Sequence, residues 1–364
     1  MFKSIDTMTI PEDPTYIEDF PPARTFSTRE SFIWWWWMFF FKEDGVRKQI
    51  VAYWTTKTYP DVTVNGVNWG PAAELSGTSE KFSYNGMSTY WYWDGTKFQE
   101  IKPMVSRFTS SQENGGLEIH SDDVHHSHDK ENFFLQFCRD PEEFDLQVDS
   151  ISPSTPPVGY KRTLLTKKMG FDALKIYNAK FTGSLNTMGN DRRIEGSLYM
   201  QNITLNSPAF PWLWGVFHKD DGSYLTYFTS FMGPLMFSRK SRCRPWMDNR
   251  FKFLNKNFNY TPEGQETKRF KNIRYSVIRN EKGMPEFEIT GSLGEEKLRA
   301  RIRTIAKTTY TFERKKYWKN KFFYNEFPAE VVSLEYTDAE GKVHSDDPEQ
   351  WTGNSEYSWG MLLN

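Results

Sequence analysis

This sequence has few cysteines, no excess of either charge and no long apolar run. Its 364 residues include 2 cysteines, too few for a disulfide framework or a cysteine-based metal motif. Lysine and arginine total 46 against 47 aspartates and glutamates, so the chain lacks the basic excess with which proteins bind nucleic acid or acidic lipids. The longest apolar run covers residues 32–41, about half of the roughly 20 residues that a membrane helix needs. We therefore expect no nucleic-acid partner and no transmembrane segment.

A basic start followed by an apolar stretch, the mark of a secretory signal peptide, is also missing. Residues 1–24 instead combine repeated prolines with several acids, which predicts an extended leader. Together with two free thiols, this pattern predicts a cytoplasmic protein. Peripheral contact with a membrane surface and the oligomeric state stay open at this point.

Aromatic residues are what the chain has in surplus. They make up 17% of it, although the mean hydropathy is −0.70. Short aromatic and β-branched stretches alternate with pairs such as Asp44-Gly45, Asn65-Gly66 and Asn85-Gly86. Such stretches favour strands, and such pairs supply the positive φ angles of tight hairpin turns. The sequence therefore predicts an all-β protein built from antiparallel barrels or sandwiches.

A segment rich in serine and proline, Ser150–Gly159, divides the chain. Composition of this kind is typical of linkers and of crossings between sheets. We therefore predict an N-terminal β-domain over residues 25–152 and a C-terminal β-domain over residues 160–364. Both have a normal size for a barrel.

Four consecutive tryptophans, Trp34–Trp37, lie within the apolar run. On a strand, Trp34 and Trp36 would face one side and the other two the opposite side. Both faces must then be dry, either as a central core strand or because one face lines an apolar pocket. Aromatic walls suit flat, unsaturated ligands. We predict that three same-face pairs bind a hydrophobic small-molecule substrate: Trp34 and Trp36, Trp91 and Trp93, Trp212 and Trp214.

Three segments carry a family resemblance. They are Glu30 with the tryptophan run, then Gly196–Asn202, and then Trp212–Gly215 followed by Asp221–Tyr224. In this order they resemble the carotenoid 1,2-hydratases (hydroxyneurosporene synthases) and AttH-like proteins, whose architecture the fungal decalin-forming Diels–Alderases share. The resemblance implies two lipocalin-like antiparallel β-barrels packed through an aromatic interface. It also implies an apolar polyene or isoprenoid-like substrate in or between them.

The chain departs from the hydratase pattern at one point. Hydratases of this group usually carry an aspartate that protonates the polyene, where this sequence has Gln201 and Asn202. An amide cannot act as a general acid. Pericyclic ring closure needs no such acid, only a folded substrate and a polarised carbonyl. We therefore predict a cofactor-free, Diels–Alderase-like cyclase, with Gln201, Asn202, Tyr199 and Tyr224 as its polar catalytic groups.

Two alternatives stay open. The first is hydration or isomerisation of a double bond, with an acid from elsewhere, such as Asp220, Asp221 or the histidine-rich segment His120–His128. The second is a non-catalytic carrier of hydrophobic molecules. In the histidine-rich segment, His126 and His128 would share a strand face near two aspartates, but the spacing matches no zinc signature. We interpret this segment as an exposed loop and predict neither a metal nor a cofactor.

Overall fold

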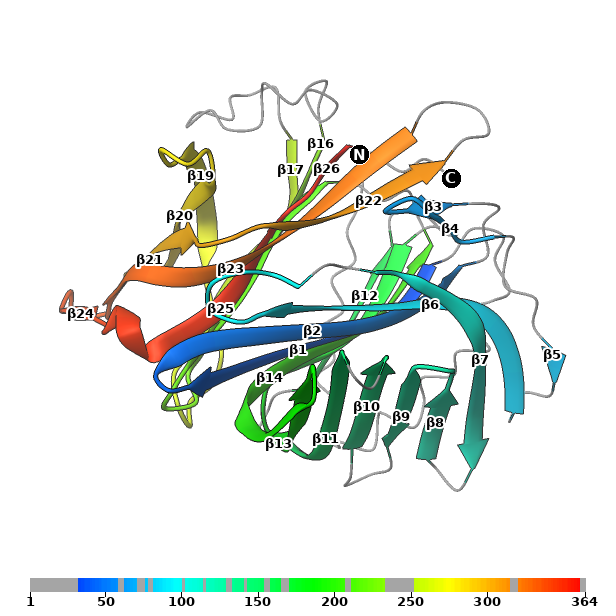
Figure 1. Cartoon of the computed structure of the whole chain (residues 1–364). Helices are drawn as coiled ribbons and strands as arrows, with labels where there is room; N and C mark the ends of the chain where they lie inside the picture. Colours follow the sequence, from blue (N-terminus) through cyan, green and yellow to red (C-terminus); the bar gives the residue numbers. More distant parts are fainter. Residues whose placement is uncertain are drawn as a thin grey trace. The chain divides into compact units, whose positions relative to one another are not determined.

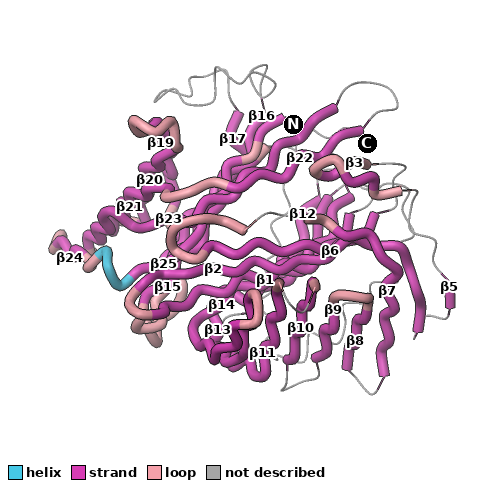
Figure 2. Tube along the Cα trace, in the orientation of Figure 1, coloured by secondary structure: helices cyan, strands magenta, loops and turns pink. Residues whose placement is uncertain are grey.

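The computed structural model describes residues 32–57, 62–70, 76–77, 81–99, 102–113, 116–128, 133–140, 143–153, 158–164, 170–206, 211–232, 252–314 and 320–360. The predicted leader, residues 1–24, and Glu30 lie outside these ranges. The chain forms two compact units, the first over Met1–Gly95 and Gln99–Ser207 and the second over Pro208–Leu363 together with Thr96–Phe98. The described part is almost entirely strand, with one short 3₁₀ helix, η4 (Pro348–Gln350) (Figure 2).

The first unit is built from antiparallel strands that follow one another in the chain. They are β1 (Phe32–Glu43), β2 (Val46–Lys57), β3 (Thr63–Val64), β4 (Val67–Asn68), β5 (Ser76–Gly77), β6 (Lys81–Trp93), β7 (Met104–Glu113), β8 (Gly116–His120), β9 (Val124–His128), β10 (Phe133–Arg139), β11 (Phe144–Pro153), β12 (Val158–Leu164), β13 (Gly170–Thr187) and β14 (Asn190–Asn206).

Ten of these strands close into a barrel. Their order is β11-β10-β9-β8-β7-β6-β2-β1-β14-β13, and β13 pairs back onto β11. Figure 1 shows β7 to β11 side by side along one wall. Closure removes the free edges of the sheet, which would otherwise invite pairing with other chains.

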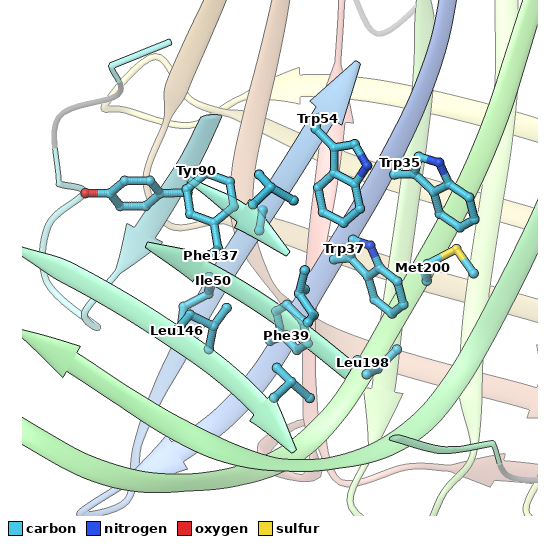
Figure 3. Close-up of a cluster of buried hydrophobic side chains, with 14 of the residues drawn as sticks. Trp35, Trp37, Phe39, Ile50, Trp54, Tyr90, Phe137, Leu146, Leu198 and Met200 are labelled. Atoms are coloured by element: carbon cyan, nitrogen blue, oxygen red, sulfur yellow. The ribbon is translucent and has the colours of Figure 1, made fainter. Parts of the chain in front are cut away.

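Strand β1 explains why the tryptophan run is tolerated. Trp35, Trp37 and Phe39 point into the barrel core, where Trp37 and Phe39 are fully buried (Figure 3). The alternate residues, among them Trp36 and Met38, point away from that core and are buried as well. Both faces of the strand are therefore dry, as the sequence predicted.

The second unit is a second antiparallel sheet. Its strands are β15 (Trp212–Lys219), β16 (Tyr224–Met232), β17 (Lys252–Thr261), β18 (Lys268–Arg269), β19 (Lys271–Arg279), β20 (Pro285–Leu293), β21 (Glu296–Thr304), β22 (Thr308–Arg314), β23 (Asn320–Thr337), β24 (Val343–Ser345), β25 (Trp351–Tyr357) and β26 (Trp359–Gly360).

In this unit the main strand order is β18-β17-β16-β15-β25-β23-β21-β20-β19. The sheet curls around its own apolar core, which includes Phe217, Tyr227, Phe287 and Trp351. The backbone N–H of Phe270, just before β19, donates to the carbonyl of Phe258 on β17 at 2.9 Å. The two ends of the sheet thus approach each other.

The hairpin turns follow the predicted chemistry with one exception. Asp44, Gly45, Asn65 and Gly66 all have positive φ angles, between 46° and 85°. Asn85-Gly86 was expected to be a turn but lies inside β6. Glycine is needed there because an added Cβ would come within 2.6 Å of the Phe108 ring.

The all-β architecture of antiparallel sheets is thus confirmed. The domain boundary expected at Ser150–Gly159 falls inside the first unit, because β13 and β14, which follow this segment, pair with β11 and β1 and complete the barrel. The predicted aromatic interface between domains stays a prediction. Within the described residues we find no helix of the length and apolarity that crossing a membrane requires.

Candidate functional site

Each unit has a second buried face outside its own core. In the first unit, alternate side chains of β14, β1, β2 and β6 point away from the barrel interior. We call this set the unit 1 outer face. Its aromatic and amide members include Tyr199, Gln201, Trp34, Trp36, Tyr53, Trp91 and Trp93. All are buried except Trp34, which is half-buried.

Trp36 is the centre of the unit 1 outer face. Its ring lies 5.0 Å from that of Trp91, edge on, and 5.3 Å from that of Tyr53. On the other side, β14 places Gln201 directly opposite Trp36. The hydroxyl of Tyr199 donates to Oε1 of Gln201 at 2.9 Å. The structure therefore brings Tyr199 and Gln201 together beside the predicted substrate-binding tryptophans of this unit.

Asn202 does not belong to this set. It lies opposite Trp35, on the core side of β14, and is 2% exposed. Its side-chain N–H donates to the carbonyl of Trp34 at 3.2 Å, while its Oδ1 has no hydrogen-bond partner. Because neighbouring residues on a strand point to opposite faces, Gln201 and Asn202 cannot act on one substrate from the same side. Gln201 and Asn202, both predicted as polar catalytic groups, thus lie on opposite faces of β14.

In the second unit, the corresponding surface is formed by β15, β16, β23 and β25. Leu213 and Phe217 of β15 point into the core, so Trp212 and Trp214 point away from it. We call this side the unit 2 outer face. It carries Trp212, Trp214, Tyr224, Tyr324, Glu326, Asn354 and Glu356. All of these are buried except Trp212, which is half-buried.

Tyr224 stands apart from the other predicted catalytic residues. It belongs to the second unit, and its hydroxyl lies 3.4 Å from that of Thr267. It pairs across the sheet with His218 and Thr261. The four predicted polar groups thus separate into the Tyr199–Gln201 pair, Asn202 in the barrel core and Tyr224 in the second unit.

Two buried glutamates, which were not predicted from the sequence, lie at the centre of the polar groups on the unit 2 outer face. Glu326 of β23 and Glu356 of β25 are direct cross-strand partners, 0% and 3% exposed. The Tyr324 hydroxyl lies within hydrogen-bond distance of both carboxyls, 2.6 Å from Oε1 of Glu356. The indole N–H of Trp212 donates to Glu356 at 2.5 Å, and the Asn354 amide donates to Glu326. We call these five residues the glutamate cluster.

The electrostatics of the glutamate cluster favour a neutral carboxylic acid. Burial raises the pKa of Glu326 well above its ordinary value, and the charge of Glu356 beside it raises this pKa further. The hydrogen bonds that Glu326 accepts from Tyr324 and Asn354 lower its pKa, but they do not outweigh the burial. Burial, followed by the charges of the two glutamates, likewise raises the pKa of Tyr324. Each of two carboxyls on directly paired residues disfavours ionisation of the other, so this pair favours keeping a proton.

The acids proposed from the sequence are less suitable as proton donors than the glutamate cluster. Burial raises the pKa of Asp221, but hydrogen bonds from Lys219 and Ser223 outweigh it and leave this pKa below its ordinary value. Asp221 is therefore ionised at neutral pH and forms an ion pair with Lys219 at 2.9 Å. In the histidine-rich segment, the carboxylate of Asp123 is bound by Arg139 at 2.5 Å.

That segment is not the exposed loop we expected. It forms β8, a tight turn and β9, and His126 is fully buried in the barrel core. The His126 ring lies 4.8 Å from Trp35, 5.4 Å from Trp37 and 5.2 Å from Trp54. On the opposite, outward face, Glu118, His120 and His125 place three potential metal ligand atoms within 4.8 Å of one another.

One signal in the sequence could have revealed the glutamates. Glu326 follows Phe322 and Tyr324 at every second position, so it occupies a strand phase that is otherwise aromatic. An acid in that phase must be buried with the rings. Its partner, 30 positions later, can be recognised only from the pairing of β23 with β25.

Comparison with known proteins supports the fold. Neither a protein-family model nor a curated protein matches the sequence. Among solved structures, the chain is similar to a protein described as an AttH from Nitrosomonas europaea, with a TM-score of 0.53 and 11% identity over 93% of this chain and 95% of that one. A kievitone hydratase from Nectria haematococca gives a TM-score of 0.44 and 10% identity over 90% and 88% of the two chains, too low to carry an argument. The first likeness confirms the AttH-like fold that the sequence resemblance implied.

Proposed function

We propose that this protein is an enzyme that protonates a double bond of an apolar, unsaturated small molecule, leading to its hydration or isomerisation. The observation that carries this proposal is the buried pair Glu326 and Glu356. A carboxylic acid that stays protonated at neutral pH is the group that such a reaction requires. The sequence left hydration as an alternative that needed an acid from outside Gln201 and Asn202, and the glutamate cluster is a candidate for that acid.

The chemistry balances without a cofactor. The proton shared by the two glutamates forms a C–H bond with one alkene carbon and leaves a cation on the other. In hydration, a water oxygen bonds to that cation and the water's proton returns to the carboxylate. In isomerisation, a neighbouring C–H bond breaks instead, and its proton returns to the same carboxylate. Both routes restore the starting enzyme.

The aromatic surroundings of the glutamates suit such a cation. The ring of Trp212 lies 5.1 Å from that of Phe322 and 5.4 Å from that of Tyr324. Aromatic faces attract cations, and more strongly where water is excluded. Trp212 is half-buried while the glutamates are buried. We infer that a substrate first contacts the indole of Trp212, a residue that the sequence predicted to bind substrate.

Cyclisation remains a second candidate because of the unit 1 outer face. There the Tyr199–Gln201 pair lies among Trp36 and Trp91, a dry aromatic surface with an amide N–H to polarise a carbonyl. This arrangement would fold a polyene and activate it without proton transfer to carbon. The carrier hypothesis predicts binding by the same surfaces without turnover.

The test compares Glu326→Gln and Glu356→Gln with wild type, using farnesol, retinol, squalene and lycopene as probes and mass spectrometry of the products. We expect conversion of at least one probe by wild type and a fall of at least about 100-fold in each variant, the low end of a general-acid contribution. Glu335→Gln, on the same strand but outside the glutamate cluster, should keep full activity. Unchanged turnover in both glutamate variants would refute the proposal, and binding without turnover by wild type would favour a carrier.

A further inference from the structure

The outward face of the hairpin formed by β8 and β9 gathers three side chains that can bind a metal. Glu118 and His120 are two residues apart on β8 and therefore share a face. His125 on β9 pairs directly with His120 across the hairpin. Nε2 of His120 lies 2.9 Å from Oε1 of Glu118, and Nε2 of His125 lies 3.5 Å from the same oxygen. Two imidazole nitrogens and one carboxylate oxygen thus converge on one point.

The hairpin turn holds the two histidines in place. Ser121 N donates to the carbonyl of Val124 at 2.8 Å, and Val124 N donates back to the Ser121 hydroxyl at 3.1 Å. Between them, the Asp123 carboxylate is buried inside the barrel, where it accepts hydrogen bonds from Arg139 and Ser88 at 2.5 Å each. The turn is therefore anchored to the barrel interior, and the outward ligands sit on paired strands.

Ring contacts orient the histidines further. The His120 and His125 rings stack with centroids 4.1 Å apart and planes 22° apart. Phe134, on the neighbouring strand β10, packs against the His125 ring at 5.0 Å. Ligands held in this way lose little conformational freedom when they bind a metal, which is the requirement for a preorganised site.

We propose that Glu118, His120 and His125 form a binding site for one divalent transition-metal ion, for which Zn²⁺ fits best. Two imidazoles and a carboxylate are a borderline donor set that Zn²⁺ accepts with bonds of about 2.0–2.2 Å. Donor atoms around such an ion are about 3.3 Å apart in tetrahedral geometry, close to the separations of 2.9 and 3.5 Å described above. Three protein ligands leave the remaining positions to water, because all three side chains reach the protein surface.

This set differs from the one that the sequence drew attention to. His126, which the sequence offered as a ligand together with His128, points into the barrel core, whereas Glu118 and His125 lie together on the outward face. The alternation of side chains along β8 and β9, together with the register between the two strands, determines which residues share the outward face. The proposed ion would join the two strands on the outside of the barrel, directly behind the tryptophan-lined His126.

The experiment is isothermal titration of the full-length protein, first freed of metal, with Zn²⁺. Wild type should bind one strong equivalent, and His120→Ala, His125→Ala and Glu118→Gln should each weaken binding at least tenfold. His344→Ala is the matched control, because His344 is an exposed histidine next to a carboxylate, Asp338, at 2.7 Å, in the second unit. It should bind Zn²⁺ like wild type.

Two results would overturn the proposal. One is the absence of a strong equivalent in wild type. The other is binding that persists in His125→Ala and in His120→Ala, which would place the ion elsewhere. Circular dichroism of each variant confirms that the barrel is intact, and the ligands are surface side chains whose removal should not disturb its core. Co²⁺ serves as a second probe: its visible absorption in wild type should disappear in His125→Ala and remain in His344→Ala.

Discussion

Replacing Glu326 with glutamine should change the pH dependence of stability in a defined direction. In the folded protein, burial and the neighbouring Glu356 raise the pKa of Glu326 well above its ordinary value. In the unfolded chain the carboxyl ionises normally, near pH 4.3. Above that pH the folded state therefore binds a proton that the unfolded state has released. A raised pKa of this kind stabilises the fold most at low pH, and the stabilisation is lost as the pH rises.

The size of the effect follows from one retained proton. The free energy of unfolding should fall by about 1.4 kcal/mol for each pH unit over the range in which only the folded state keeps the proton. In Glu326→Gln there is no such proton, and Glu356 no longer faces a second acid. Over that range, the free energy of unfolding of the variant should fall less steeply with pH than that of wild type, by up to about 1.4 kcal/mol for each pH unit.

Urea unfolding at a series of pH values, followed by tryptophan fluorescence, measures both free energies. The quantity of interest is the difference in the free energy of unfolding between wild type and Glu326→Gln as a function of pH. The contributions of the other titrating groups cancel in this difference. Glu335→Gln, on the same strand, is the control and should run parallel to wild type. Parallel curves for wild type and Glu326→Gln would show that the pair holds no extra proton, and would remove the acid from the proposed mechanism.

Three further predictions concern single side chains. Gln201→Ala should lower any cyclisation activity at least tenfold and Asn202→Ala should not, because the two amides lie on opposite faces of β14; product formation by both variants measures this, and equal losses would contradict it. Gly353→Ala should cost about 2 kcal/mol or more in urea unfolding, since the added methyl group would overlap the backbone and a ring of β15; an unchanged midpoint would contradict it. Asp221→Asn should destabilise the protein more at pH 7 than near pH 3, because the lowered pKa of Asp221 stabilises the fold above the ordinary pKa and this stabilisation is lost as the pH falls; an equal loss at both pH values would contradict it.

Side-chain alternation and turn chemistry predicted much of the local structure from the sequence. The two dry faces of the tryptophan run, the hairpins at Asp44 and Asn65 and the all-β architecture follow from side chains that are close in sequence. Local rules of this kind hold because a strand alternates its side chains regardless of what it pairs with. Even there, Asn85-Gly86 shows that tertiary packing overrides a turn preference.

Long-range pairing could not be predicted in this way. The Ser150–Gly159 segment has the composition of a linker, yet the strands after it return to close the first barrel. The glutamate cluster depends on the pairing of β23 with β25, which brings together residues 30 positions apart. Gln201 and Asn202 were grouped into one site because they are adjacent in sequence, but adjacent residues of β14 point to opposite faces of the sheet.

Isotope incorporation tests the central claim most directly. Wild-type protein and the two glutamine variants are incubated with the same four probes in D₂O and, separately, in H₂¹⁸O. If the glutamate pair protonates carbon, the wild-type product carries deuterium on carbon, with ¹⁸O as well if the reaction is hydration, and Glu326→Gln and Glu356→Gln form little of it. A wild-type product that contains neither isotope, or one formed equally by the variants, would contradict the account.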